Sequence, residues 1–199
     1  MSILVVLAHP KTGSFNHAIA DTICATLRQG GKEVIFHDLQ AEGFDPVYPA
    51  GELARDATVP AAIETATAEV MDAEGIVVIH PNYWSAPPAI LKGWLDRVLR
   101  AGKTYRFQTG ADGRGYVQSL IAAKAAMVVT TANTPDEVDR TVYGDPLENF
   151  WKTCVFGFFG IHRFRRCSFS SVIMSTPEQR AGWLADAART TRELFLSQP

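Results

Sequence analysis

The chain has 199 residues, a mass of 21.8 kDa and a formal net charge of −2 at pH 7. A chain of this length can bury one sizeable core, so we expect residues 1–199 to form a single domain. Its charge balance is slightly acidic and its basic residues are scattered apart from a short run at 163–166, which argues against a nucleic-acid-binding protein.

The cysteines and the first residues bear on cellular location. Cys24, Cys154 and Cys167 form neither a CxxC motif nor a metal-ligand spacing, and their odd number argues against a disulfide framework. We therefore expect no metal site and a reducing compartment. The apolar run at Ile3–Ala8 lacks a basic flank and is too short for a signal peptide or a membrane span, which favours a cytoplasmic protein.

The first half of the chain alternates strands and helices. Residues 3–7 form an all-apolar strand, and a helix opens at about Ser14, a good N-cap, with apolar residues every four positions up to Leu27. Residues 33–39 predict a second strand nearer the sheet edge, and residues 40–58 are irregular. A helix is expected over about residues 60–73.

The second half repeats this alternation. Strands are predicted at 76–79, 124–131 and 164–173, and helices at about 88–98, 145–160 and 176–195. The last two helices begin with capping boxes, Asp145 to Glu148 and Thr176 to Gln179, each with proline at the first helical position. Three glycines within residues 106–116 suggest a mobile excursion.

Strand and helix alternate five times, which predicts an α/β fold: a five-stranded parallel sheet with helices on both faces. Five strands of this length favour the flavodoxin-like order 2-1-3-4-5. In this order the switch point, where the order of the strands reverses, lies between strands 1 and 3. The loops after Leu7 and Ile79 should meet at that switch point, with the loop after Thr131 beside them.

The first of these loops lacks dinucleotide-binding and P-loop motifs but offers a smaller anion site. Thr12 and Ser14 supply hydroxyls, Gly13 allows close approach of a ligand, and the amides of Ser14, Phe15 and Asn16 begin a helix. These groups suit a monophosphate or a pyrophosphate. An ordinary helix cap explains the same residues equally well.

The second loop is rich in proline and aromatic residues. Tyr83 and Trp84 could form a rigid wall for a flat heteroaromatic ring, although aromatic residues also often pack in a core. His9 and His80 each follow a strand; such histidines are more often structural than catalytic, and His9 gains weight because it adjoins the anion loop. The chain has no G-x-S-x-G or H-E-x-x-H motif, so a hydrolase is disfavoured.

The motifs at residues 9–16, 81–84, 88–94 (P-A-I-L-K-G-W) and 130–131 together resemble the flavodoxin-like NAD(P)H:quinone oxidoreductases of the DT-diaphorase type, across nearly the whole chain. The resemblance implies a flavin-dependent enzyme that reduces quinones or similar acceptors by ping-pong hydride transfer. Two alternatives remain open: an ancillary regulatory subunit of a potassium efflux transporter, and an electron-transfer flavodoxin.

The resemblance also implies a flavin site made of three groups of residues. Trp84 covers one face of the flavin, and Tyr143 aligns with the catalytic histidine of the family. Ala132 and Asn133 replace two glycines of the animal enzymes. The expected cofactor-binding residues are His9, Thr12, Ser14, Phe15 and Asn16 at the phosphate, Pro81, Asn82, Tyr83, Trp84 and Ser85 along the isoalloxazine ring, and Thr131, Ala132 and Asn133 at its pyrimidine end.

FMN is the expected cofactor, because the sequence lacks the C-terminal segment of long FAD-binding relatives. FAD is the alternative, since Asn16 stands where those relatives touch the adenylate part, and NADH and NADPH are both open as donors. We also expect a homodimer, because Phe156, Phe158 and Phe159 add to an aromatic density too high for one small core. By resemblance, Tyr105, Phe107 and Phe158 of a partner chain would roof the substrate pocket; internal packing is the alternative.

Overall fold

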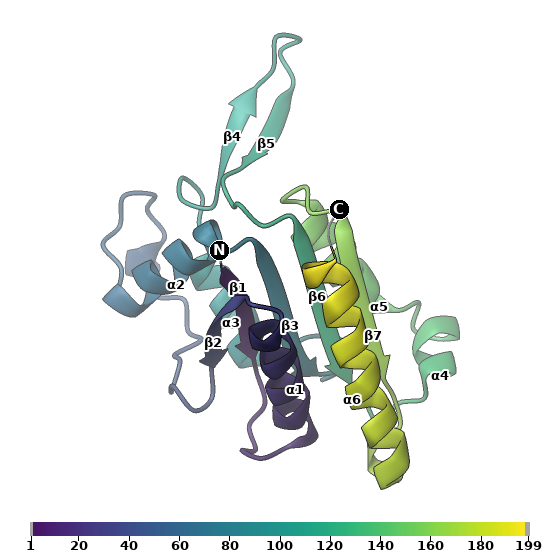
Figure 1. Cartoon of the computed structure of the whole chain (residues 1–199). Coiled ribbons are helices and arrows are strands. Elements are labelled where there is room, and N and C mark those ends of the chain that lie inside the picture. The colour runs from purple at the N-terminus through teal and green to yellow at the C-terminus, as the bar shows by residue number, and fades with distance from the viewer. Residues whose placement is uncertain (1, 198–199) are drawn as a thin grey trace.

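The computed structural model describes residues 2–197 and contains a five-stranded parallel sheet in the order β2-β1-β3-β6-β7 (Figure 1). Numbered along the chain, this order is 2-1-3-4-5, so the predicted flavodoxin-like topology is confirmed. The strands are β1 (Ser2–Leu7), β2 (Glu33–Asp38), β3 (Gly75–Pro81), β6 (Ala125–Thr131) and β7 (Arg163–Phe169).

Burial explains the order of the strands. Every residue of β3 and β6 is buried, as expected for apolar, β-branched runs with helices on both faces. The outer strand β2 has no fully buried residue, which agrees with its mixed sequence and edge position. The register places Leu7 beside Ile79 and Pro81 beside Thr131, so the carboxyl ends of the central strands lie at one edge.

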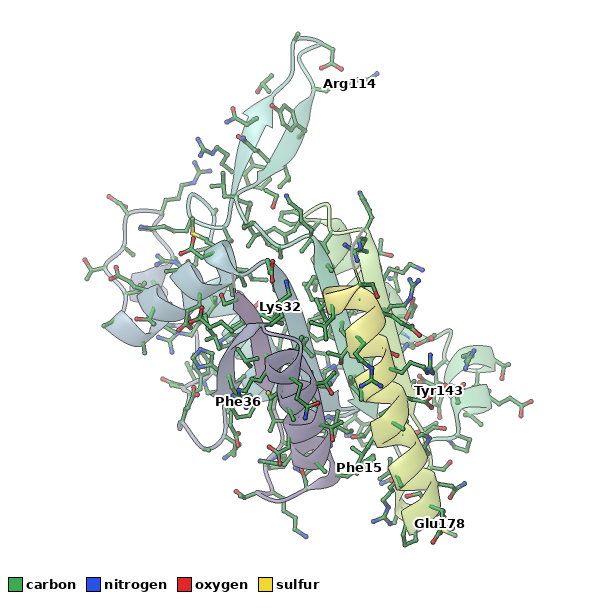
Figure 2. All side chains as sticks on the ribbon, in the orientation of Figure 1. Phe15, Lys32, Phe36, Arg114, Tyr143 and Glu178 are labelled. Carbon is green, nitrogen blue, oxygen red and sulfur yellow. The ribbon has the colours of Figure 1, made fainter. Side chains whose placement is uncertain are left out.

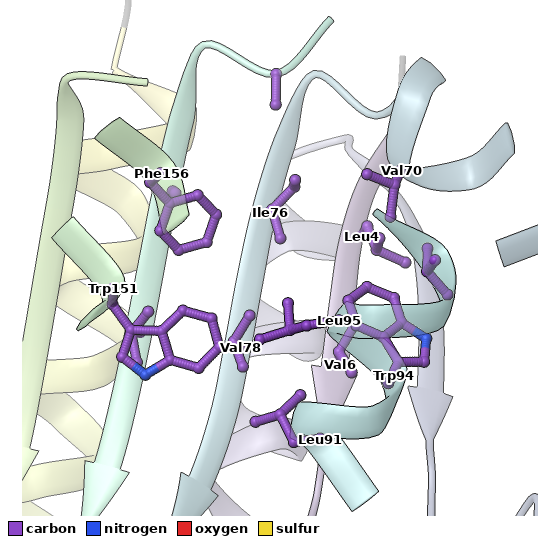
Figure 3. Close-up of a cluster of buried hydrophobic side chains, with 14 of the residues drawn as sticks. Leu4, Val6, Val70, Ile76, Val78, Leu91, Trp94, Leu95, Trp151 and Phe156 are labelled. Carbon is purple, nitrogen blue, oxygen red and sulfur yellow. The ribbon is translucent and has the colours of Figure 1, made fainter. Parts of the chain in front are cut away.

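Helices cover both faces of the sheet, as predicted. One face packs against α1 (Phe15–Gln29), α6 (Pro177–Thr191) and the wider turns of η4 (Arg192–Leu196). The other face packs against α2 (Ala61–Asp72), α3 (Ala89–Val98) and the π-helical η2 (Asn149–Gly157). Figure 3 shows this second layer, where Trp94, Trp151 and Phe156 cover the sheet residues Ile76 and Val78.

The predicted helix starts are partly confirmed. Thr176 and Gln179 form a complete capping box, with each side chain bonded to the backbone of the other residue. Asp145 accepts the amide of Glu148 at 3.3 Å but has a left-handed backbone (φ 48°). The short α5 (Pro146–Glu148) that begins there continues directly into η2.

Residues 106–116, predicted as a mobile excursion, belong to an antiparallel hairpin that the sequence pattern did not predict; their mobility stays a prediction. The hairpin consists of β4 (Tyr105–Thr109) and β5 (Gly115–Ser119), in which Phe107 pairs with Val117. The glycines lie in or beside the connecting turn, where Gly113 has φ 76°. The hairpin extends from the end of the sheet at which the strands begin (Figure 1).

Three further differences are local. The fifth strand ends at Phe169 rather than Ile173, because Ser171 is left-handed (φ 54°) and starts η3 (Val172–Met174). Two short helices, α4 (Asp136–Thr141) and η1 (Ala50–Glu52), were not predicted from the sequence.

Between residues 2 and 197, no helix is both long and apolar enough to cross a bilayer.

Candidate functional site

The loops after β1, β3 and β6 meet at the carboxyl edge of the sheet and are joined by hydrogen bonds. The amide of Ala8 donates to the carbonyl of Ile79 at 3.0 Å, and the amide of Asn82 donates to the carbonyl of Thr131 at 2.7 Å. The side chain of Asn16, buried on α1, donates to Thr131 Oγ1 at 2.9 Å. The three predicted groups of site residues therefore lie together, as the switch-point argument required.

The first loop and the start of α1, residues 9–16, form an open cradle. Gly13 has φ 68°, and no atom lies within 4 Å of where its Cβ would stand. Among the described residues, the amides of Phe15 and Asn16 have no hydrogen-bond acceptor, as usual for the first turn of a helix. Two free amides and the positive end of the α1 dipole make this cradle suitable for a phosphate.

Ser14 occupies the predicted N-cap position, but its hydroxyl does not cap the helix. Its Oγ lies 2.8 Å from Nδ1 of His17, whose Nε2 lies 3.0 Å from Oδ2 of Asp38 at the end of β2. His9 lies beside this group, with its ring centre 6.3 Å from that of His17. His17 and Asp38 were not among the predicted site residues; the S-x-x-H spacing at a helix start was the available signal.

The second loop makes a tight turn at residues 83–86, which we call the aromatic turn. Tyr83 and Ala86 exchange backbone hydrogen bonds of 3.0 and 3.1 Å, while Trp84 (φ 56°) and Ser85 (φ 59°) are both left-handed. Such a backbone costs a non-glycine residue about 1–2 kcal/mol. The Trp84 side chain is fully exposed, so the alternative that it packs in the core is wrong. Strain and exposure in one turn are typical of a functional site.

Asn82, next to the aromatic turn, has an unsatisfied side-chain oxygen. Its Oδ1 is buried and has no hydrogen-bond partner within residues 2–197. An acceptor in this state costs about 1–3 kcal/mol, unless a ligand supplies a donor. This atom is therefore an independent indication that a polar ligand binds against the loop.

The third loop is held by its own hydrogen bonds. The amide of Ala132 donates to the carbonyl of Phe169 at 2.9 Å, and Asn133 Oδ1 accepts the amide of Ile173 at 3.1 Å. Since the side chains of Asn16 and Thr131 are also paired with each other, these residues hold the loop in place from inside. The Asn16 side chain does not point outward to an adenylate group.

Two cavities lie along α3 and η2. One, of about 360 Å³, is lined at the aromatic turn by Ser85 and Ala86, and at η2 by Asn149 and Phe150. The other, of about 480 Å³, shares Phe150 with the first and extends to Tyr105 and Phe158. They form neighbouring depressions that run from the aromatic turn toward the base of the hairpin.

Comparison with known proteins decides the family. A family model described as a flavodoxin-like fold matches residues 1–194. An FMN-dependent NADH:quinone oxidoreductase of Xanthomonas oryzae is 32% identical over 160 residues, which cover 78% of this chain and 75% of that protein. The chain belongs to the flavodoxin-like NAD(P)H:quinone oxidoreductase family.

Two further similar proteins match nearly the full length of this chain. An uncharacterized NAD(P)H oxidoreductase of Haemophilus influenzae is 28% identical over 195 residues, or 96% of this chain and 95% of that protein. The crystal structure of Smu.1420 from Streptococcus mutans superposes with a TM-score of 0.83 at 29% identity, over 97% of this chain and all of that one. The similarity thus extends over all three loops of the site.

The two histidines at strand ends, His80 and His9, differ in burial. His80 is fully buried; its Nδ1 donates to the Pro81 carbonyl at 2.7 Å and its Nε2 accepts the Trp151 indole N–H at 2.9 Å. Burial lowers the pKa of His80 to about 4, so the ring is neutral and structural. His9 is partly exposed, and its Nδ1 accepts the Lys11 amide at 3.1 Å; burial also lowers its pKa.

Tyr143, expected from the resemblance to stand at the position of the family's catalytic histidine, lies between α4 and α5 and is half exposed (Figure 2). Arg166, buried on β7, holds this connection through an ion pair with Asp145 at 2.5 Å, and its Nε donates to Thr130 Oγ1 at 3.3 Å. The position of Tyr143 is thereby linked to β6, the strand that carries the third loop.

The residues expected at a substrate pocket are not at the site within one chain. Arg114, at the hairpin tip, and Phe15, in the cradle, lie at opposite ends of the molecule (Figure 2). Tyr105 packs against Phe158 at the base of the hairpin, with ring centres 5.0 Å apart. Phe156 and Phe159, expected in excess of the core, are buried in it, so that part of the argument is wrong.

Proposed function

We propose that this chain is a flavin-dependent NAD(P)H oxidoreductase that reduces quinones or similar acceptors by ping-pong hydride transfer. The observation that carries the proposal is the aromatic turn. A strained turn presents a fully exposed indole, it follows the unsatisfied Oδ1 of Asn82, and its loop shares the carboxyl edge of the sheet with the open phosphate cradle. A flat ring with a polar edge and a phosphate tail matches all three features.

Each part of the site has a role in this proposal. The amides of Phe15 and Asn16, with the α1 dipole, hold the phosphate, and Thr12 contributes its hydroxyl. Pro81 through Ser85 would form one wall for the ring, with the exposed Trp84 indole and with Asn82 Oδ1 as a hydrogen-bond acceptor. Residues 131–133 would lie at the pyrimidine end. A bound flavin would supply the hydride acceptor and donor, while the wall leaves one ring face open to substrates.

FMN is the proposed flavin. The cradle offers two free amides and hydroxyls to a terminal phosphate, and the Xanthomonas relative is named FMN-dependent. The inward direction of the Asn16 side chain, bonded to Thr131, removes the one contact that favoured the adenylate part of FAD.

The reaction also requires a proton when a quinone is reduced to the quinol. We assign to Tyr143 the role of holding or orienting that proton at the acceptor oxygen through its phenol hydroxyl. The Arg166–Asp145 ion pair would fix the connection on which Tyr143 stands.

The proposed working unit is a homodimer of one domain per chain. An isolated two-stranded hairpin is only marginally stable in water, and this one leaves Phe107 and Tyr116 exposed by 63% and 53%. An antiparallel second copy would bring Tyr105, Phe107 and Phe158 over the partner's aromatic turn. Light scattering should give about twice the chain mass at micromolar concentration, and Phe158→Asp should yield a monomer that reduces quinones poorly. A fully active monomer would refute the shared site.

Titration with FMN, followed by stopped-flow mixing with NADH or NADPH, tests the main proposal. We expect the fluorescence of FMN to be quenched on binding and its visible absorbance to bleach on adding the donor, as in any flavin reduction. Trp84→Ala should weaken binding. A protein that binds no flavin, or whose flavin is bleached by neither donor, contradicts the proposal.

A further inference from the structure

A chain of three side chains runs beneath the phosphate cradle. Ser14 Oγ lies 2.8 Å from His17 Nδ1, and His17 Nε2 lies 3.0 Å from Asp38 Oδ2. The side chains of His17 and Asp38 are only 16% and 13% exposed. Ser14 begins the helix turn whose amides face the cradle, so its hydroxyl is the end of this chain nearest a bound phosphate.

The proton content of His17 determines the direction of both hydrogen bonds. A neutral imidazole has one donor and one acceptor nitrogen, and a carboxylate can only accept. Nε2 must therefore donate to Asp38, which leaves Nδ1 to accept the hydroxyl hydrogen of Ser14. In this state Ser14 turns only lone pairs toward the cradle and repels an anion.

A second proton reverses the arrangement. With both nitrogens protonated, Nδ1 donates to Ser14 Oγ, and the hydroxyl hydrogen becomes free to donate to a phosphate oxygen. The new positive charge is balanced by Asp38 on one side and by the phosphate on the other. Proton and phosphate thus stabilise each other at this position.

The other charged groups near His17 do not replace this proton. The ring of His9 faces it from the loop, Lys11 lies close to His9, and the exposed Asp21 lies one turn along α1. His9 accepts the Lys11 amide through Nδ1, and burial disfavours its charged form by lowering its pKa. Of the two imidazoles at the cradle, His17 is the one with a carboxylate partner, so it is the position there at which an added proton is best compensated.

We propose that Ser14, His17 and Asp38 form a proton-linked phosphate receptor, in which a flavin phosphate binds together with a solvent proton on His17. The inference rests on the proposed flavin site and extends it: these three residues select the phosphorylated flavin, FMN, over riboflavin. His17 and Asp38 act as positioning residues through Ser14.

Calorimetry of FMN and riboflavin binding tests this directly. Titrations at pH 8 in two buffers of different ionisation enthalpy give the number of protons taken up; the FMN phosphate is already a dianion there and contributes none. We expect uptake of about one proton per FMN and about none per riboflavin. Equal uptake for the two ligands, or none for FMN, overturns the inference.

His17→Gln separates the proton from the hydrogen bond. The glutamine amide can donate to Ser14 without titrating, so FMN should still bind while proton uptake falls toward zero. His162→Gln, at an exposed histidine outside the site, is the matched control and should retain the uptake. Unchanged uptake in His17→Gln would assign the proton elsewhere and contradict the proposal.

Asp38→Asn gives a second, independent result. Loss of the carboxylate that balances the charge on His17 should weaken FMN binding at pH 8 about tenfold and leave riboflavin binding unchanged. Equal losses for both ligands would show a structural role only. If neither flavin binds the wild-type protein, the proposed function itself fails; FMN binding without proton uptake overturns this inference alone.

Discussion

At the carboxyl end of the sheet three loops are tied together by hydrogen bonds within one chain, whereas at the opposite end the β4–β5 hairpin extends outward with Phe107 and Tyr116 exposed. The first end has unsatisfied groups of the kind that a small ligand can complete, two helix amides and the Asn82 oxygen. The second has apolar surface, which only a larger partner can cover. We infer that one chain builds the cofactor half of the site and a second copy completes the substrate half.

The largest expected effect concerns the wall of the larger cavity. Arg97 and Glu52 form a buried pair, with Nη2 to Oε1 at 2.6 Å and Nε to Oε2 at 3.1 Å. Arg97→Met leaves Glu52 buried and unpaired, which should lower the free energy of unfolding by about 3–5 kcal/mol in urea titrations at pH 7. The double variant R97M/E52L should lose clearly less. Additive losses would show that the two side chains are not coupled.

Tyr143→Phe tests the proposed role of the Tyr143 hydroxyl in holding a proton at the acceptor oxygen. Without the hydroxyl, quinone turnover should fall about 10²-fold, while the rate of flavin reduction by NADH stays nearly unchanged. The comparison variant is Tyr116→Phe, because both tyrosines are 53% exposed. Equal rates for Tyr143→Phe and the wild type would assign Tyr143 a structural place.

His80 accepts a hydrogen bond from the indole N–H of Trp151 and so connects the end of β3 with η2. Burial lowers its pKa from 6.5 to about 4, so the unfolded chain binds a proton at higher pH than the folded one. His80 therefore stabilises the fold fully above pH 6.5, and this contribution is lost as pH falls toward 4. Between pH 7 and pH 5 the free energy of unfolding should drop by about 2 kcal/mol from this group.

Comparison with His80→Gln isolates that contribution, because glutamine can still accept the Trp151 indole N–H but does not titrate. Subtracting the pH profile of His80→Gln is necessary, because His37 changes the pH dependence of stability in the opposite direction. Burial disfavours its charge, but hydrogen bonds with Glu69 and Glu42 outweigh burial and raise its pKa. Identical pH profiles for the variant and the wild type would contradict the role given to His80.

The smallest effect concerns the aromatic turn. Ser85 is left-handed, so Ser85→Gly should be more stable than Ser85→Ala by about 1 kcal/mol in thermal or urea unfolding. Alanine keeps the strain and removes the same hydroxyl, which makes it the matched reference. If the turn is held for the flavin, Ser85→Gly should also bind FMN more weakly. Equal stability of the two variants would show that the left-handed backbone of Ser85 is not strained.

Much of the cofactor half could be predicted from local patterns. The apolar runs of β1, β3 and β6 identify strands buried on both faces, and their alternation with helices leaves few topologies. The aromatic loop after β3 and the small-residue loop after β1 therefore meet at the switch point. The hairpin was missed because its glycines mark a turn, and two short exposed strands with mixed residues carry no strong period.

By itself, then, the sequence determined which segments become strands and helices and which loops share an edge, because hydrophobic period and capping act over a few neighbouring residues. Tertiary structure alone decided the pairings between distant segments. Arg97 reaches Glu52 across 45 positions, Asp38 reaches His17 across 21, and Gly93 is required because a Cβ there would lie 2.2 Å from the Pro46 carbonyl. Such contacts depend on the three-dimensional register of packed elements, which no local pattern encodes.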